Sequence, residues 1–160
     1  MLSNVTKDRD FALMMKQHLV DLLAFLFEKE QNFGVLCKIE DVSFNPELPE
    51  YMQDGFSHLT LFFLAGYTFE SAYVESDHLI FEAGFGSENF GSVVSVPLLS
   101  IMQVIVDETP IFINLSELKL EDLNASEKPK ANVDEKSVEA SMSVFLSNPE
   151  NEKFFKKGDE

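Results

Sequence analysis

Apolar residues recur with helical spacing at the start of the chain and with alternate spacing after it. A helix is predicted from Thr6, whose hydroxyl can cap its first turn, to about Gln31. Between Leu19 and Phe27 only Asp21 is polar, so apolar side chains occupy more than one face of this helix. One apolar stripe is enough to cover a β-core. The second stripe predicts a homodimer in which two such helices meet through Leu19, Leu23 and Phe27; the alternative is deeper burial within one subunit.

Short alternating segments follow the helix and predict strands. Alternation begins after Gly34, and the prolines of segment 45–49 interrupt it, because proline lacks a backbone donor. Pro97 suits the first turn of a short helix, predicted at 98–106. Together these elements predict an α+β fold: a long N-terminal helix, then a compact, mostly antiparallel β-barrel or two-sheet domain with a second short helix. The predicted later strands are 59–64, 71–74, 78–85, 93–96 and 110–115.

The composition changes near Glu117, where a Phe- and Val-rich body gives way to a segment rich in Glu, Lys, Asn and Ser. Such a segment cannot build a core, which predicts a domain at 6–116, a flexible acidic linker at 117–143 and a terminal segment at 144–160. That last segment is apolar in places, which is unexpected unless something binds it; the alternative is that it docks back on the barrel. Its two candidate anchors are Val144-Phe145-Leu146 and Phe154-Phe155-Lys156-Lys157.

Charge and chemistry narrow the function classes. The 160 residues include 12 basic and 28 acidic side chains, a formal charge of −16 that repels phosphate backbones and anionic lipids. We therefore expect no nucleic-acid partner and no membrane. Cys37 is the one cysteine, which rules out an intrachain disulfide and favours a reducing cytoplasm. His18, His58 and His78 are scattered, and no nucleophile and base pair can be argued, so we expect no enzyme, no metal and no cofactor.

Three sequence blocks resemble one known family. Leu-Pro-Glu-Tyr-Met-Gln-Asp-Gly at 48–55 is similar to V-P-x-E-Y-x-x-D-G, Phe-Glu-Ala-Gly-Phe-Gly at 81–86 to F-N-A-R-F-G-G, and Ser-Val-Pro-Leu at 95–98 to S-V-P-L. In this order behind a long helix, over residues 8–115, they resemble the stringent starvation protein B (SspB) family, which has a Sm-like barrel. The resemblance implies a bacterial cytoplasmic adaptor of the ClpXP protease. The barrel would hold the ribosome-rescue (ssrA-type) tag of a substrate, and the tail, through 154–157, would dock on the ClpX unfoldase.

Candidate groove residues follow from this resemblance and from the strand pattern. An extended peptide needs an apolar wall and small residues that let its backbone approach. Ala83 matches the groove-lining stretch of the family, whereas Gly84 stands where the family block has arginine, so the preferred tag can differ. Large aromatic residues such as Phe81 are more often core than groove. The candidates are Phe62, Leu64, Ala83, Gly84, Phe85, Ser95, Val96 and Pro97.

Two alternatives compete with an adaptor. Small Sm-like barrels also bind RNA, but an RNA site needs a basic stripe with stacking aromatics, and the lysines here are few and mostly in the tail. The other alternative is a structural homodimer with no delivery role. It differs from an adaptor in predicting that deletion of 154–157 has no functional consequence.

Overall fold

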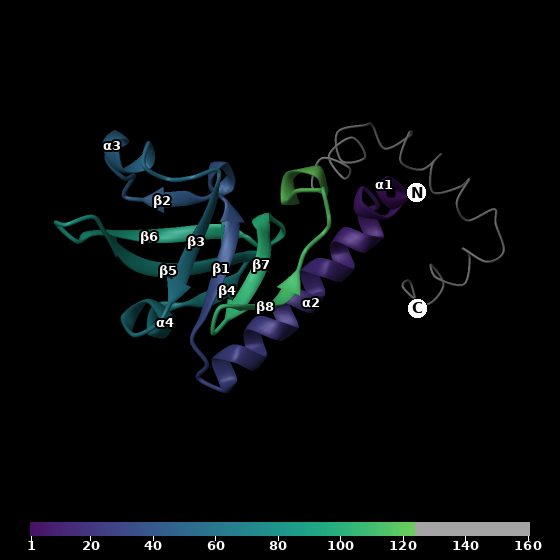
Figure 1. Ribbon diagram of the computed structural model, residues 1–160, viewed down its shortest axis with the longest axis horizontal. Coiled ribbons are helices and arrows are strands. Elements are labelled where there is room, and N and C mark those ends of the chain that lie inside the picture. Colours follow the sequence, from purple (N-terminus) through teal and green to yellow (C-terminus); the bar gives the residue numbers. More distant parts are fainter. Residues whose placement is uncertain (124–160) are drawn as a thin grey trace, which may run out of the picture. The chain divides into compact units, whose positions relative to one another are not determined.

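A computed structural model describes residues 1–123 of the chain (Figure 1). The chain divides into two units, Met1–Leu120 and Glu121–Glu160. The first unit has the predicted α+β fold. Its elements in order are α1 (Leu2–Thr6), α2 (Arg9–Glu28), β1 (Phe33–Lys38), η1 (Ile39–Asp41), β2 (Ser43–Asn45), α3 (Glu50–Gln53), β3 (Leu59–Leu64), α4 (Tyr67–Ser71), β4 (Tyr73–Glu75), β5 (His78–Phe85), β6 (Phe90–Pro97), η2 (Leu98–Ser100), β7 (Ile101–Val106) and β8 (Thr109–Ile113).

Two four-stranded sheets form the body of this unit. Sheet A has the strand order β3-β1-β7-β8 and sheet B has the order β2-β6-β5-β4, and all their pairings are antiparallel (Figure 1). Alternate side chains of both sheets point into one shared core, as the period of two in a strand requires. Among the fully buried side chains are Phe33, Val35, Leu64, Leu79, Phe81, Val94, Val96 and Ile101.

The long helix begins at a different cap from the predicted one. Asp8 has an extended backbone, and its carboxylate accepts a hydrogen bond from the backbone N–H of Phe11 at 3.0 Å, so Asp8 is the N-cap of α2. The prediction of Thr6 as the cap was wrong, because Thr6 ends the separate helix α1. Its buried hydroxyl donates instead to the carboxylate of Glu117.

The predicted dimer residues of the helix lie in the core of a single chain. Leu19 and Leu23 are only 1% and 0% exposed, and they join Leu26 in the core cluster. Phe27 is half-buried, with its ring edge-on to Phe33 and Phe69 at centroid distances of 5.7 and 5.6 Å. The prediction that Leu19 and Leu23 form a dimer contact is therefore corrected, and deeper burial within one subunit, the stated alternative, accounts for both. At the half-buried Phe27 the contact with a second copy stays a prediction.

The segment predicted as a second helix is mostly a strand. Only Leu98–Ser100 turns as a short 3-10 helix, η2, and Ile101–Val106 then pairs with β1 and β8 as strand β7. Pro97 does start a helical turn, but the β-branched residues at 101, 104, 105 and 106 favour an extended backbone. The helix α2 contacts η2.

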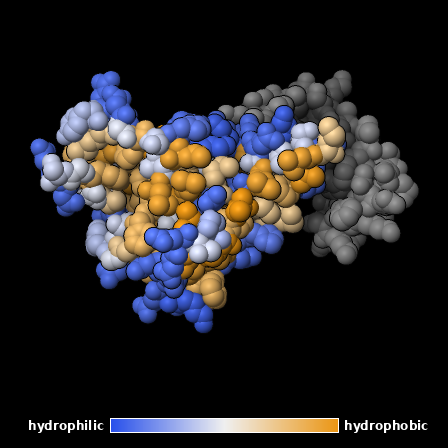
Figure 2. Space-filling view, viewed as in Figure 1, coloured by the Kyte–Doolittle hydropathy of each residue, from blue (hydrophilic) through white to orange (hydrophobic). Residues whose placement is uncertain are grey.

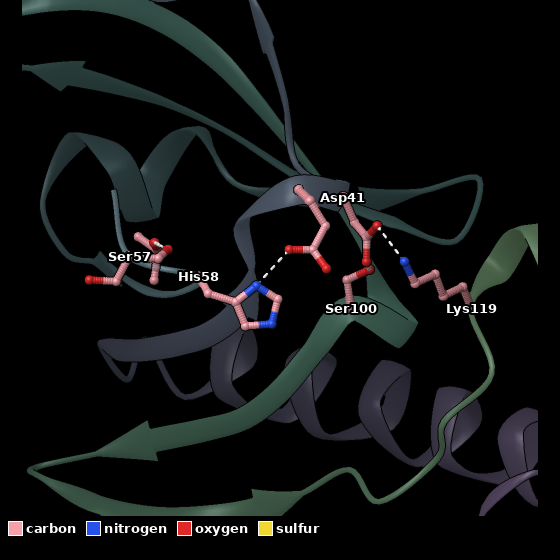
Figure 3. A network of polar contacts seen from close by, with 7 residues as sticks. Asp41, Ser57, His58, Ser100 and Lys119 are labelled. Atoms are coloured by element: carbon pink, nitrogen blue, oxygen red, sulfur yellow. Dashed lines mark hydrogen bonds and ion pairs between the residues drawn. The ribbon is translucent and has the colours of Figure 1, made fainter. Parts of the chain in front are cut away.

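Polar contacts tie the chain after β8 to the rest of the unit. The buried Asn114 donates from its amide nitrogen to the carbonyl oxygens of Leu99 and Ile101, at 3.2 and 3.1 Å. Asp41 accepts from the hydroxyl of Ser100 at 2.8 Å and pairs with the ammonium of Lys119 at 3.2 Å (Figure 3). Because these contacts reach past residue 117, the compact unit continues to Leu120, beyond the predicted domain end at 116.

The predicted tail falls almost wholly outside the described residues. Most of the linker and both candidate anchors, at 144–146 and at Phe154, Phe155, Lys156 and Lys157, lie beyond residue 123. Within residues 1–123, every helix is either too short or too polar to span a lipid bilayer.

Candidate functional site

Alternation along the β5–β6 hairpin gives sheet B two different faces. Phe81 on β5 and Val94 on β6 are paired and fully buried, so they face the core. The next pair, Glu82 and Val93, therefore faces outward. Two residues further along, Gly84 of β5 pairs with Gly91 of β6 on the same outer face. Two facing glycines leave a strip of backbone there without side chains.

A cavity of about 530 Å³ lies over this part of the outer face. Its size is within the range of about 300–1,000 Å³ that is usual for ligand sites. The wall combines the end of β2, the start of α4 and the middle of the β5–β6 hairpin, which are far apart in the sequence. The lining residues are Asn45, Pro46, Tyr67, Thr68, Glu82, Ala83, Gly84, Asn89, Gly91, Ser92 and Val93.

The helix α4 forms one side of the cavity and is held against β5 by polar contacts. Gly66 precedes it with φ of +59°, a backbone conformation that glycine adopts without strain. The Tyr67 hydroxyl donates to the Glu82 carboxylate at 3.0 Å, and the Glu82 backbone N–H donates to the Ser71 hydroxyl at 2.9 Å. The strand β4 pairs with β5 only as far as Ile80. Therefore α4 takes the place of β4 beside the last part of β5.

The Tyr67–Glu82 contact also determines the acidity of the phenol. The hydrogen bond to the Glu82 carboxylate, reinforced by its negative charge, raises the pKa of Tyr67 above its usual value near 10. Tyr67 therefore stays neutral and remains a hydrogen-bond donor at neutral pH. The negative charge on this side of the cavity comes from Glu82.

The hairpin turn explains why residue 84 is a glycine. A Cβ atom placed on Gly84 would lie 1.7 Å from Oδ1 of Asn89, so the Asn89 side chain occupies the space that a side chain at 84 would need. Asn89 has a positive φ of 52°, which asparagine tolerates better than most residues. A Cβ on Gly91 would meet nothing within 4 Å. The floor of the cavity is thus an amide over Gly84 and open backbone at Gly91.

The far end of the cavity is anchored by β2 and by aromatic packing. The Ser92 hydroxyl donates to the carbonyl oxygen of Pro46 at 2.9 Å. The ring of Phe44 on β2 meets the ring of Phe85 edge-on, with 5.6 Å between centroids, and stacks on Phe56 at 5.8 Å. These contacts fix the hairpin against β2, so the cavity wall is part of the packed fold.

The structure brings two of the predicted groove residues to this cavity, Ala83 and Gly84. Three others are corrected, since Phe62, Leu64 and Val96 are buried in the core. The predicted set combined residues from both faces of each strand, and alternation separates them. The remaining three are half-buried and do not line the cavity: Phe85 packs in the aromatic cluster, and Ser95 and Pro97 lie further along β6.

Several lining residues were not anticipated from the sequence. Alternation with the apolar Phe81 and Phe85 was a signal that Glu82 and Gly84 share the opposite face. For Tyr67 and Asn89 no comparable signal exists, because their positions depend on where α4 docks and how the hairpin turns.

The described residues offer groups for binding rather than a metal centre. No three His, Cys, Asp or Glu side chains within residues 1–123 are grouped closely enough to hold a metal ion. Burial, with a smaller effect of the Asp41 charge, raises the pKa of Cys37 to about 12, so its thiol is protonated at neutral pH. What the cavity presents is a carboxylate, a phenol, amides, hydroxyls and exposed backbone.

Comparisons with known proteins add no family to these observations. No protein-family model matches the chain, and no curated protein matches its sequence. The function is therefore argued from the cavity and from the resemblance of the three sequence blocks.

Proposed function

We propose that this protein is a specificity adaptor. In this proposal, the cavity on sheet B captures an extended peptide of the ribosome-rescue (ssrA) type at the end of a substrate. The protein then delivers that substrate to the ClpX unfoldase of the ClpXP protease in the bacterial cytoplasm. The basis is the resemblance of three sequence blocks to the SspB family, together with a cavity at the residues of one of them.

The observation that carries the proposal is the open backbone at Gly91 on the cavity floor. Extended peptides bind by laying their backbone close to strands and by placing alternate side chains into flanking pockets. At Gly91 nothing stands in the way of such an approach, whereas the Asn89 amide covers its partner Gly84. Val93, which is 38% exposed, supplies apolar contact, while Tyr67 and Asn89 supply polar groups at the edges.

Two of the three resembling blocks also meet in space. The block at 48–55 forms α3 and its flanks, and the block at 81–86 forms the end of β5. A Cβ on Gly86 would lie 2.8 Å from the terminal methyl of Met52, so the two segments touch at the end of the hairpin. Segments from distant parts of the chain are thus joined at the end of the hairpin whose middle lines the cavity.

Delivery requires a connection to the unfoldase, and the proposal gives this role to the C-terminal tail. A flexible tether holds a captured substrate at an effective concentration of about millimolar, so weak capture becomes efficient delivery. The anchor proposed on the tail is 154–157, with 144–146 as the alternative. Both lie beyond the described residues.

A second copy of the chain remains part of the proposal, but through a different surface. We propose that the outer face of sheet A makes this contact. It exposes apolar side chains from both edge strands, and Figure 2 shows apolar residues gathered on the same side of the molecule. None of the four strands of sheet A contains an acidic residue, although residues 1–123 hold 20 acidic and 6 basic side chains. Two such acidic copies would meet most favourably there. The exposed residues are Leu59, Leu61, Phe63, Ile111 and Ile113.

Capture is tested by fluorescence anisotropy of a labelled ribosome-rescue tag peptide titrated with the whole protein. Binding at micromolar concentration that Gly91→Gln removes is the expected result, since Gly91 lies on the outer face and a side chain there would extend into the open space of the cavity. Ala24→Gln, on an exposed helix position, is the matched control and should bind as the wild type does. Far-UV circular dichroism of both variants checks that they fold. Absence of binding by the wild type at high concentration would reject tag capture.

Binding and degradation assays with the same protein distinguish an adaptor from an RNA-binding barrel and from a structural dimer. An RNA-binding barrel would bind a labelled oligouridine in place of the peptide, with an affinity that falls steeply with salt. A structural dimer would deliver nothing, so deletion of 154–157 would leave degradation of a tagged substrate by ClpXP unchanged. For an adaptor, the deletion should remove delivery and leave peptide binding intact.

A further inference from the structure

The cavity on sheet B has a negative charge and nothing basic to balance it. Glu82 is the one carboxylic acid among its lining residues, and no lysine or arginine is among them. Within residues 1–123 the Glu82 carboxylate accepts a hydrogen bond from the neutral Tyr67 hydroxyl, while the backbone N–H of Glu82 donates to Ser71, and neither contact neutralises the carboxylate. The Tyr67 hydroxyl reaches Oε1, which leaves lone pairs on both oxygens for a ligand.

Neutral and apolar groups surround this carboxylate in a way that suits a long basic side chain. Val93 is directly opposite Glu82 across the ladder, and Tyr67 contacts Glu82 through its hydroxyl. Both are exposed at the surface. The aliphatic stem of a lysine or arginine packs on such groups while its charged end reaches an acid. A tyrosine ring adds attraction for a cation.

We infer that this cavity selects peptides with a basic residue, whose lysine or arginine side chain pairs with Glu82 while the peptide backbone crosses Gly91 beside the Asn89 amide. The inference rests on the proposed peptide capture and deepens it by naming the charge of the segment that is captured. Against the resembling block F-N-A-R-F-G-G, this chain replaces a neutral residue with Glu82 and a basic one with Gly84. Both changes make the site more favourable to a cation.

The electrostatic attraction by all acidic side chains together must be distinguished from the specific pairing with Glu82. The excess of acidic side chains in residues 1–123 attracts any cationic peptide over a long range, and salt screens that attraction. Pairing with Glu82 in the cavity depends on one carboxylate. A remote carboxylate of the same sheet, Glu75 at the end of β4, does not line the cavity and provides the matched control.

The test uses three labelled versions of one extended peptide, Ala-Asn-Xaa-Ala-Asn-Tyr-Ala, with lysine, glutamine or glutamate at Xaa. Anisotropy titrations with the whole protein at physiological salt should rank them lysine first and glutamate last. Glu82→Gln should weaken binding of the lysine peptide roughly three- to tenfold, between the effect of an exposed ion pair and of a charged hydrogen bond. It should also remove the ranking, whereas Glu75→Gln should keep it.

Each outcome bears on one proposal or on both. Equal binding of the three peptides by the wild type would overturn the charge preference and leave peptide capture standing. A ranking that survives Glu82→Gln would also overturn it, because the acidic field would then be the cause. If none of the three peptides nor the tag peptide binds, peptide capture itself fails.

A double variant tests the inference in the opposite direction. Asn89→Gly removes the amide that occupies the space above Gly84, and glycine accepts the positive φ of residue 89. Gly84→Arg in that background places a cation on the floor of the cavity. The preference for the lysine peptide over the glutamate peptide should then be lost or much reduced, because the arginine balances the charge of Glu82. An unchanged preference for lysine in a correctly folded double variant would contradict the assignment of charge selection to this cavity.

Discussion

The outer faces of the two sheets differ, although the sheets share one core. The outer face of sheet A carries leucine, phenylalanine and isoleucine side chains, and its strands contain no acidic residue. The outer face of sheet B at the hairpin carries Glu82, two facing glycines and the amide of Asn89. A broad apolar surface is typical of contact with another folded protein. A hollow with exposed backbone and a few polar groups suits a single extended segment.

This difference shows that the outward-facing positions of a strand carry the information about function. Inner faces of both sheets obey the same packing requirement, so their apolar residues identify the core and nothing more. The outer residues are free of that requirement. Their chemistry, taken as pairs across the ladder such as Glu82 with Val93, carries the information about partners.

The sharpest test of inner against outer positions uses two neighbours on β3. Phe62 is 6% exposed and packs on Phe81, whereas Phe63 is 62% exposed. Replacement of Phe62 by alanine should lower the free energy of unfolding by about 3–5 kcal/mol, the usual cost of deleting a buried phenylalanine. Phe63→Ala should cost about 0.5 kcal/mol or less in a single chain. Urea unfolding followed by circular dichroism measures both.

The dependence of these stability losses on protein concentration shows whether a second copy covers sheet A. If a second copy covers sheet A, the cost of Phe63→Ala grows with protein concentration, because association stabilises only the folded state. The cost of Phe62→Ala should stay large at every concentration. Equal and concentration-independent losses for the two variants would contradict the assignment of opposite faces.

The second prediction compares the outer faces directly. Leu61→Asp places a charge in the apolar face of sheet A and should weaken self-association by at least about tenfold, equivalent to about 1.4 kcal/mol. Val93→Asp makes the same change of charge on the outer face of sheet B and should leave the association constant unchanged. Sedimentation equilibrium of the two variants and the wild type gives the constants. Loss of association in Val93→Asp alone would move the contact to sheet B.

Much of the fold follows from the sequence, because period-two patterns and turn residues specify most strands. The failure at 98–106 has a physical reason: a proline at a helix start and β-branched residues in a strand give opposing local signals, and pairing with β1 and β8 decides between them. The helix shows a similar limit. Its sequence shows that apolar stripes exist but not that the core takes the one with Leu19 and Leu23.

The candidate site was less predictable than the fold. Ala83 and Gly84 could be found because one short block resembles a known family. The outward position of Glu82 could be predicted from the alternation of inward and outward residues along β5. The contact of Tyr67 with Glu82 and the cover of Gly84 by Asn89 join residues through tertiary docking, which no local pattern encodes.

The smallest predicted effect concerns the proton on Tyr67. Because the Glu82 carboxylate accepts its hydrogen bond, Glu82→Gln should lower the pKa of Tyr67 toward the usual value of about 10. Since the folded-state pKa is raised, the contact stabilises the fold below about pH 10 and is lost as pH rises through the folded value. Absorbance of the phenolate, or the NMR shift of the Tyr67 ring, follows the titration. Glu75→Gln changes the net charge equally and should leave the titration in place. A curve that does not move in Glu82→Gln would mean that the hydrogen bond does not form in solution, and the Glu82 carboxylate would then be oriented for a ligand by the cavity wall alone.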